Sequence, residues 1–155
     1  MDIVPTQKRS EMMAGIKAKN TGPEIRVRHF LHKNGFRFRL HRRDLPGNPD
    51  IVLPRYRTCI FVHGCFWHRH DGCKLASNPK SRQDFWREKF GANVRRDKLN
   101  RRLLEEDGWR VVIVWECGLR KYGPAGLDWL PHWLRGDAGS IEWPPGPLGT
   151  DDSAL

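Results

Sequence analysis

Two hydrophobic patterns recur along the chain, one with the period of a strand and one with the period of a helix. Residues 36–41 read Phe, Arg, Phe, Arg, Leu, His, which is the alternation of a strand with one basic face. Short apolar strands are predicted at 50–53 and 58–63, with a turn between them. The continuous apolar run at 111–115 is typical of a strand buried between helices on both faces of a sheet. These patterns predict a mixed α/β domain.

Helical periodicity fills much of the remaining chain. Thr21 has the position of an N-cap, and Glu24 stands three residues later in the capping-box position, so a helix is predicted to begin here. The longest helix is predicted over 81–107, with Phe85 among its core residues and Arg and Lys on its other faces. A short amphipathic helix is predicted at 127–134.

The patterns divide the chain into three segments. Residues 1–20 are predicted to be a basic arm, helical or ordered over 8–20, and residues 21–135 a single folded domain. A chain of 155 residues is long enough to bury a core without disulfide bonds. Residues 136–155 contain four acidic and no basic side chains among Gly and Pro, and are predicted to be a flexible acidic tail.

The charge balance points to a polyanionic partner. Lys and Arg number 28 against 18 Asp and Glu, and the net charge is +10 at pH 7. Such an excess favours nucleic acid, because each neutralised phosphate releases counterions, and an anionic membrane is the second candidate. The sequence shows neither a signal peptide nor an apolar stretch of the roughly 20 residues that span a membrane. We therefore expect a soluble intracellular protein, whose cysteines stay reduced.

Histidines and cysteines crowd residues 61–73, which read Phe-Val-His-Gly-Cys-Phe-Trp-His-Arg-His-Asp-Gly-Cys. Thiolates and imidazoles at such short spacing suit a tetrahedral zinc ion. Four nitrogen and sulfur ligands would close the site and make it structural rather than catalytic. The alternative is that the cysteines are simply buried and the histidines solvated, as we expect of Cys59 in its apolar strand. The predicted ligands are Cys65, His70, Cys73 and Cys117.

A second candidate site centres on Asp50. It opens a strand, and counting outward from the turn at 54–57 places it opposite Phe61 or Val62 on the next strand. Restriction-type nucleases bind Mg²⁺ with such a Pro-Asp and an acid-X-Lys triplet on the second strand. Here the triplet is Phe61-Val62-His63 and lacks its acid, so a metal would use Asp50 and a backbone carbonyl. Alternatively, Asp50 is a turn residue, and Glu24 only begins a helix.

Five segments together resemble the very short patch repair (Vsr) DNA mismatch endonuclease family, in order over residues 8–120. They are Thr21-Gly-Pro-Glu-Ile, Leu45-Pro-Gly-Asn-Pro-Asp-Ile-Val, Phe61-Val-His-Gly-Cys-Phe-Trp-His-Arg-His, Phe85-Trp-Arg-Glu-Lys, and Gly108-Trp-Arg-Val through Trp115-Glu-Cys. The resemblance implies a single-domain restriction-endonuclease-like fold with a central mixed β-sheet flanked by helices. It also implies an enzyme that nicks DNA beside the thymine of a T:G mismatch left by deamination of 5-methylcytosine.

The resemblance also implies roles for individual residues around a catalytic metal. Asp50 would coordinate Mg²⁺ together with the carbonyl oxygen of Val62, where the family often has Thr, because a carbonyl ligand tolerates the change to Val. Glu24 and His63 would hold metal-bound waters. His68 would be the general base that activates the attacking water, as the near-neutral titration of imidazole permits.

Further implied roles concern orientation and DNA contact. Asp97, on the long predicted helix, would orient His68. Phe66, Trp67 and Trp86 would wedge between base steps, where unstacking costs least at a mismatch. The alternative for these aromatic side chains is a place in the core.

The expected partner is double-stranded DNA with a T:G mismatch, and a single nick needs only a monomer. The resemblance further implies a bacterial cytoplasmic, nucleoid-associated protein with mismatch-repair proteins as possible partners. Two other functions stay open: a restriction-type nuclease of the same fold without mismatch specificity, and a non-catalytic zinc-stapled DNA-binding module. An acid and an imidazole converging on the aromatic loop would favour a nuclease over the binding module.

Overall fold

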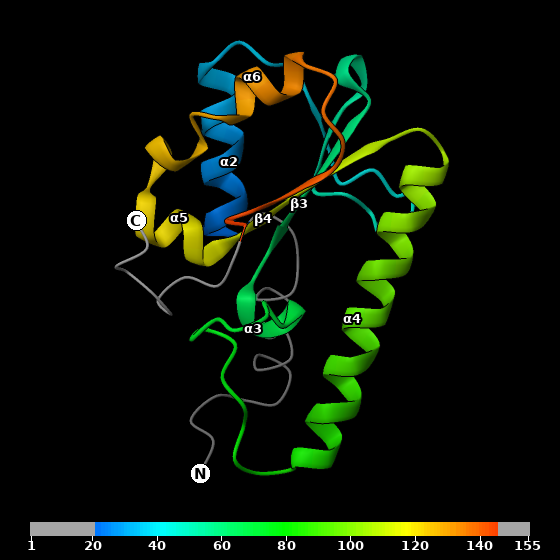
Figure 1. Ribbon diagram of the computed structural model, residues 1–155, viewed down its shortest axis with the longest axis vertical. Coiled ribbons are helices and arrows are strands. Elements are labelled where there is room, and N and C mark those ends of the chain that lie inside the picture. Colours follow the sequence, from blue (N-terminus) through cyan, green and yellow to red (C-terminus); the bar gives the residue numbers. More distant parts are fainter. Residues whose placement is uncertain (1–20, 146–155) are drawn as a thin grey trace, which may run out of the picture.

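A five-stranded mixed sheet forms the centre of the molecule in the computed structural model, which describes residues 21–145 (Figure 1). The strands lie side by side in chain order, and β1 to β3 are antiparallel whereas β3 to β5 are parallel. Their bounds are β1 (Arg39–Leu40), β2 (Ile51–Leu53), β3 (Thr58–His63), β4 (Arg110–Trp115) and β5 (Ile141–Trp143).

Helices cover both faces of this sheet, as the sequence predicted. The helices α2, α5 and α6 lie on one face, and α4 crosses the other (Figure 1). Their bounds are α2 (Gly22–Lys33), α3 (Cys65–His68), α4 (Gln83–Glu106), α5 (Glu116–Tyr122) and α6 (Leu130–Arg135), with short 3-10 turns η1 (Pro54–Tyr56) and η2 (Pro124–Leu127). The predicted helices that begin after Thr21 and fill most of 81–107 are confirmed.

Burial on both faces explains why β4 is apolar throughout. Val112 and Val114 belong to the core beneath α2, whereas Val111, Ile113 and Trp115 belong to a second core on the α4 side. Successive side chains of a strand point to opposite faces, so each core takes alternate residues. The strand thus joins two hydrophobic cores into one domain.

The strand β5 corrects the predicted boundary of the tail at residue 136. Residues 141–143 pair in parallel with Val112 to Val114, so part of the expected tail completes the sheet. Trp143 packs tightly against Gly118 and Gly126, where an added Cβ would lie 2.7–2.8 Å from the indole ring. An unpaired edge of β4 would expose the N–H and C=O groups of an apolar strand, and the three residues of β5 pair with that edge.

Two further expectations are wrong in part. The alternating segment 36–41 forms a strand only at Arg39–Leu40. Phe85 is not a core residue, because the first turn of α4 extends beyond the sheet and leaves its side chain 44% exposed, beside the guanidinium of Arg82.

The predicted arm or helix at 8–20 lies outside the described residues. Cys59 is buried in the core, as expected.

Candidate active site

An open cleft of about 890 Å³ lies at the carboxyl end of β3. The elements α2, β3, α3 and α4 and the loop before β2 contribute its walls. Eight side chains that the sequence singled out line this one space, although they come from four separate segments of the chain. They are Glu24, Asp50, Val62, His63, Phe66, Trp67, His68 and Asp97.

The β2–β3 hairpin places Asp50. Ile51 pairs with Ile60, so Asp50 lies opposite Phe61, one of the two positions predicted from the turn. Its carboxylate Oδ2 accepts a hydrogen bond of 2.8 Å from the backbone N–H of Val62. The acid and the backbone of the second strand are therefore brought together, as the sequence predicted.

Glu24, in the first turn of α2, contributes a second carboxylate, which is buried, whereas Asp50 is partly buried. The residue is 2% exposed, and its two oxygens lie 3.1 and 3.0 Å from His41 Nε2. Arg28, one helical turn later, also donates to this carboxylate. Possible metal-ligand atoms of Glu24, His41 and Asp50 all lie within 4.8 Å of one another. Sequence reasoning missed His41, whose only signal is that it ends the alternating segment 36–41.

This carboxylate pair is suited to a divalent cation. The pKa of Asp50 is raised to about 8, chiefly by burial; the neighbouring Glu24 contributes to the rise, and the hydrogen bond from the Val62 N–H opposes it. Two carboxylates at close range resist ionising together, and a cation between them removes that cost. Carboxylate and carbonyl oxygens are the ligands that Mg²⁺ prefers. The residues present therefore fit Mg²⁺ at this position.

A pair of histidines lines the same cleft. The rings of His63 and His68 are stacked, with centroids 3.8 Å apart and planes within 4°. His68 Nδ1 lies 2.7 Å from Asp97 Oδ2 on α4, so the geometry joins the predicted base to its predicted orienting residue. Burial lowers the pKa of His63 well below its ordinary value, and its Nδ1 has no hydrogen-bond partner within residues 21–145.

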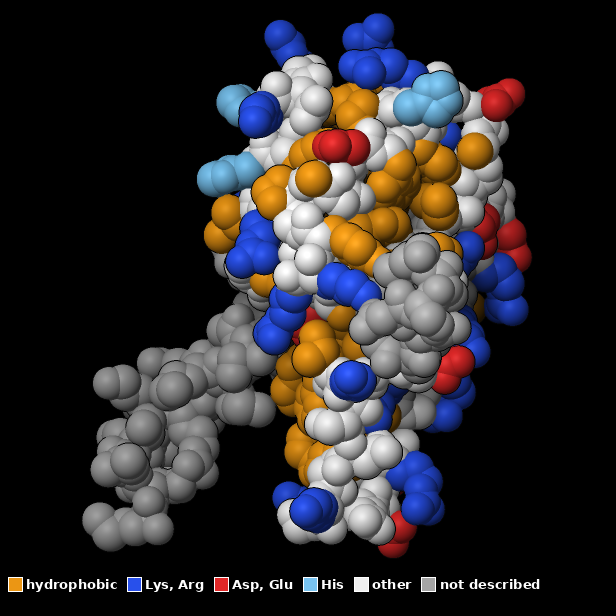
Figure 2. Space-filling view, turned by 60° about the vertical axis from the view of Figure 1, so that its left-hand side comes forward, with side chains coloured by type: hydrophobic (Ala, Val, Ile, Leu, Met, Phe, Trp, Pro, Cys, Tyr) orange, Lys and Arg blue, Asp and Glu red, His pale blue; other side chains and the backbone are white. Residues whose placement is uncertain are grey.

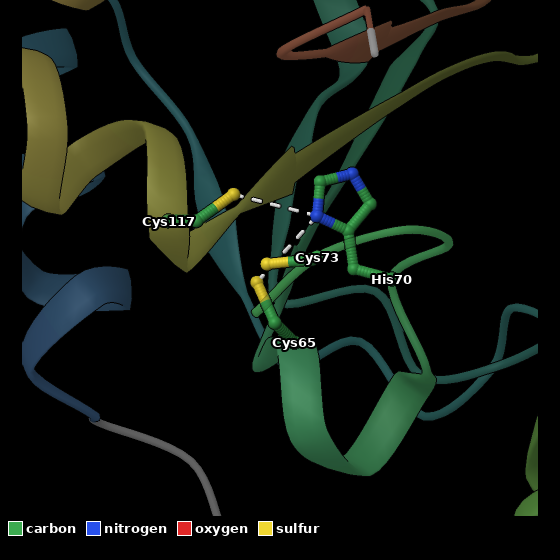
Figure 3. A group of neighbouring side chains, drawn as sticks. All are labelled: Cys65, His70, Cys73 and Cys117. Carbon is green, nitrogen blue, oxygen red and sulfur yellow. Dashed lines mark hydrogen bonds between the residues drawn. The ribbon is translucent and has the colours of Figure 1, made fainter. Parts of the chain in front are cut away.

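The four predicted zinc ligands converge on one point (Figure 3). All four are buried, and their ligand atoms lie within 4.8 Å of one another. His70 Nδ1 is 3.7 Å from Cys65 Sγ and 3.3 Å from Cys117 Sγ. Burial raises the pKa of the Cys117 thiol to about 11, a tendency that a bound metal reverses by deprotonating its thiol ligands. Three thiols and one imidazole fit a closed zinc site.

The sheet explains why ligands far apart in sequence meet. His63 and Trp115 are register partners in the parallel strands β3 and β4, so α3 and α5 begin at the same edge. Glu116 Oε1 accepts from the backbone N–H of Cys65 at 3.1 Å, which ties the start of α3 to α5. The Trp115 ring stacks on His70 with centroids 4.3 Å apart. One helical turn, α3, thus carries a candidate metal ligand, Cys65, at its start and His68 at its end.

The predicted wedge residues form one aromatic group. Phe66 and Trp67 line the cleft. Trp86 packs against both, and its ring centroid lies 6.1 Å from the Phe66 ring and 6.1 Å from the Trp67 ring. Phe90 is buried beneath them, 5.2 Å from the Phe66 ring. One side of the aromatic group is therefore buried in the protein, and the other side lines the cleft.

Arg69 packs against this aromatic group, and the sequence patterns did not single it out. Its guanidinium lies 4.0 Å above the Phe90 ring. It also donates four hydrogen bonds of 2.7–3.2 Å, to the carbonyls of Phe66, Ala76 and Ser77 and to Asn78 Oδ1. Its partners are mostly backbone carbonyls, which a sequence pattern does not reveal.

Comparison with known proteins decides the family. A family model described as DNA mismatch endonuclease Vsr matches residues 1–74. The DNA mismatch endonuclease Vsr of Escherichia coli K12 is 42% identical over 145 residues, which are 91% of this chain and 92% of that protein. The type II nicking enzyme V.XorIIP of Xanthomonas oryzae pv. oryzae is 50% identical over 122 residues, 79% of this chain and 89% of that protein. The chain belongs to the Vsr family.

Membership in the Vsr family makes the protein a nuclease, since its relatives are named endonucleases and nicking enzymes. The cleft of this Vsr-family chain has a basic rim, formed by Arg43, Lys89 and Arg96. Lys and Arg side chains are also spread over the face drawn in Figure 2. Between residues 21 and 145, no helix is both long enough and apolar enough to cross a membrane.

Proposed function

We propose that this protein nicks double-stranded DNA at T:G mismatches arising from deamination of 5-methylcytosine, by Mg²⁺-dependent phosphodiester hydrolysis. The observation that carries the proposal is one cleft that is lined by a carboxylate pair, a stacked histidine pair and an aromatic group. The names of the relatives, a mismatch endonuclease and nicking enzymes, support it. A basic rim suits the phosphate backbone.

One carboxylate of the pair would hold the cation directly, and the other would hold it through water. Asp50 and the carbonyl oxygen of Val62 would bind Mg²⁺, which supplies positive charge to stabilise the phosphate as the bond breaks. Glu24 and His63 would hold water molecules in the cleft. The depressed pKa of His63 keeps its ring neutral and able to accept a hydrogen bond.

The histidine pair supplies the base. A carboxylate accepts but does not donate, so the short contact with Asp97 places the hydrogen of neutral His68 on Nδ1. The Nε2 lone pair is then available to take a proton from the attacking water. Asp97 holds this tautomer and stabilises the imidazolium that forms. An acid and an imidazole in these positions have no use in a protein that only binds DNA.

The cysteine cluster would hold a structural Zn²⁺ that fixes α3 and hence His68, in a restriction-endonuclease-like fold. Phe66, Trp67 and Trp86 would enter the base stack. Unstacking costs a few kcal/mol and least at a mismatch, so a wedge selects mismatched DNA without reading every base. We further propose that the enzyme acts as a monomer in the bacterial cytoplasm, associated with the nucleoid and with mismatch-repair proteins as partners.

A nicking assay on three kinds of duplex tests this function. The substrates are a matched duplex, the same duplex with one T:G pair, and duplexes with other single mismatches. Preferred nicking of the T:G strand supports the proposal. Equal cutting of the matched duplex would instead indicate a restriction-type nuclease of the same fold.

Substitution of Asp50 separates catalysis from binding. Asp50→Ala should abolish nicking and leave DNA binding largely intact, because the carboxylate faces the cation rather than the DNA-binding rim. Asp44→Ala is the matched control, since Asp44 is exposed in the same loop and pairs only with Arg42 among the described residues. Retained cutting by Asp50→Ala would refute the mechanism. Binding without cutting by the wild-type protein would indicate the DNA-binding module.

A further inference from the structure

His41 contacts the proposed catalytic machinery but has no role in the mechanism above. We propose that His41 is a positioning residue that holds the Glu24 carboxylate against Asp50 and so sets the affinity of the cleft for a divalent cation. The proposal rests on the proposed function, because it concerns the same cation. It adds a residue that directly follows β1, at the sheet edge, to a site whose other proposed residues lie on α2, β3, α3 and α4 and directly before β2.

The backbone at His41 is unusual. Its φ angle is 48°, in the left-handed region that residues other than glycine rarely adopt. The residue directly follows β1, and its N–H donates to the carbonyl of Asp50 at 3.2 Å. Such conformations cost on the order of 1–3 kcal/mol and persist where surrounding contacts enforce them, which is frequent at functional sites. The turn aims the imidazole into the cleft, whose wall includes His41.

The hydrogen-bond chemistry fixes what the imidazole does. Nε2 lies 3.1 and 3.0 Å from the two oxygens of Glu24, and a carboxylate only accepts, so Nε2 carries the hydrogen. Arg28 also donates to Glu24, and its NH2 group is 3.3 Å from His41 Nε2. Two donors thus converge on one carboxylate, one from α2 and one from the end of β1. These two donors hold the buried Glu24 carboxylate in one orientation.

That orientation matters because of the distance to Asp50. Glu24, His41 and Asp50 offer ligand atoms within 4.8 Å of one another, so a small rotation of Glu24 would open the site. Residues that orient the groups around a metal typically change metal affinity or activity by 10–100-fold when replaced. Loss of the His41 donor should therefore weaken cation binding by about tenfold, without removing any proposed ligand.

The experiment uses full-length, zinc-containing protein and Mn²⁺ as the probe for Mg²⁺. Free Mn²⁺ is measured by electron paramagnetic resonance during titration of the wild type, His41→Ala and His41→Gln. The glutamine variant keeps an N–H donor near the position of Nε2. His32→Ala is the matched control, because His32 is exposed at the last turn of α2. Thermal melting checks that each variant folds, and steady-state nicking of T:G duplex gives kcat and KM.

The expected result is about tenfold weaker Mn²⁺ binding and a lower kcat for His41→Ala, with KM for DNA unchanged and His41→Gln within about threefold of wild type. Unchanged Mn²⁺ affinity in His41→Ala would overturn the proposal. Equal weakening in His41→Gln would also overturn it, because the imidazole would then act by itself and not as a donor to Glu24. Wild-type protein that binds no Mn²⁺ would overturn the proposed function along with it, whereas the first two outcomes leave that function standing.

Discussion

Replacing Asp50 with Asn should abolish activity and raise the free energy of unfolding. This increase in stability over the wild type should become larger as pH rises. Burial raises the pKa of Asp50 from 3.8 to about 8. The unfolded chain releases this proton near pH 4 and the folded protein keeps it until about pH 8, so the unfolded state binds fewer protons in between. Stability is therefore present below the unfolded pKa and is lost as pH rises through that window.

The magnitude follows from the size of the shift. Each pKa unit corresponds to about 1.4 kcal/mol, so between about pH 5.5 and about pH 8.5 the penalty from Asp50 increases by about 3 kcal/mol. The introduced asparagine resembles the protonated acid: its amide oxygen still accepts from Val62, and its N–H₂ donates toward Glu24. The stability advantage of Asp50→Asn over wild type should thus increase by about 3 kcal/mol over this pH range.

Urea denaturation followed by circular dichroism measures this difference at both pH values, after brief EDTA treatment that removes exchangeable cations and leaves the zinc in place. Taking the difference between variant and wild type cancels the other titrating groups. Asp44→Asn, an exposed position, should show no such trend. Added Mg²⁺ at high pH should restore stability to wild type and not to Asp50→Asn. A difference that stays constant with pH would refute the reasoning.

Three further predictions concern the zinc cluster, the base and the wedge. Cys117→Ser should lower both the zinc content and the free energy of unfolding, by several kcal/mol, whereas Cys59→Ser, at a buried cysteine outside the cluster, should keep its zinc in atomic absorption. Wild-type protein purified without chelators that contains no zinc would refute the cluster's role. Asp97→Asn should reduce kcat about tenfold to hundredfold in single-turnover nicking with little change in DNA affinity, and an unchanged kcat would show that His68 needs no orienting partner. Trp67→Ala should weaken binding of T:G duplex by about 1–3 kcal/mol in fluorescence anisotropy and narrow the preference over matched DNA; equal loss on both duplexes would count against a wedge.

Local patterns predicted the parts of the fold that depend on neighbouring residues. The N-cap at Thr21, the long helix ending before Gly108 and the hairpin register at Asp50 all follow from short-range periodicity or turn geometry. The parallel strand β5 did not follow, because three residues within a Gly- and Pro-rich segment carry little pattern of their own. Their partner, β4, lies far back in the sequence, and only the folded sheet reveals the pairing.

The candidate site shows the same division. Its acids, imidazoles and thiols stand out by residue type and spacing, and the family resemblance gave them roles. His41 and Arg69 did not stand out, because neither belongs to a motif and each meets its partners only in the folded chain. His41 depends on a left-handed backbone turn, and Arg69 on carbonyls of a loop. Phe85 was misjudged because periodicity cannot tell where a helix extends past its sheet.

The order in which the cysteine cluster is completed has a consequence for the life of the polypeptide in the cell. Cys65, His70 and Cys73 are synthesised close together, but Cys117 joins them only once β4 has paired with β3. Such non-local pairing forms late in folding. A metal ion that binds only the completed cluster would pull this equilibrium toward the folded state. With too little of that metal, a newly made chain would spend more time with the β3–β4 edge unpaired.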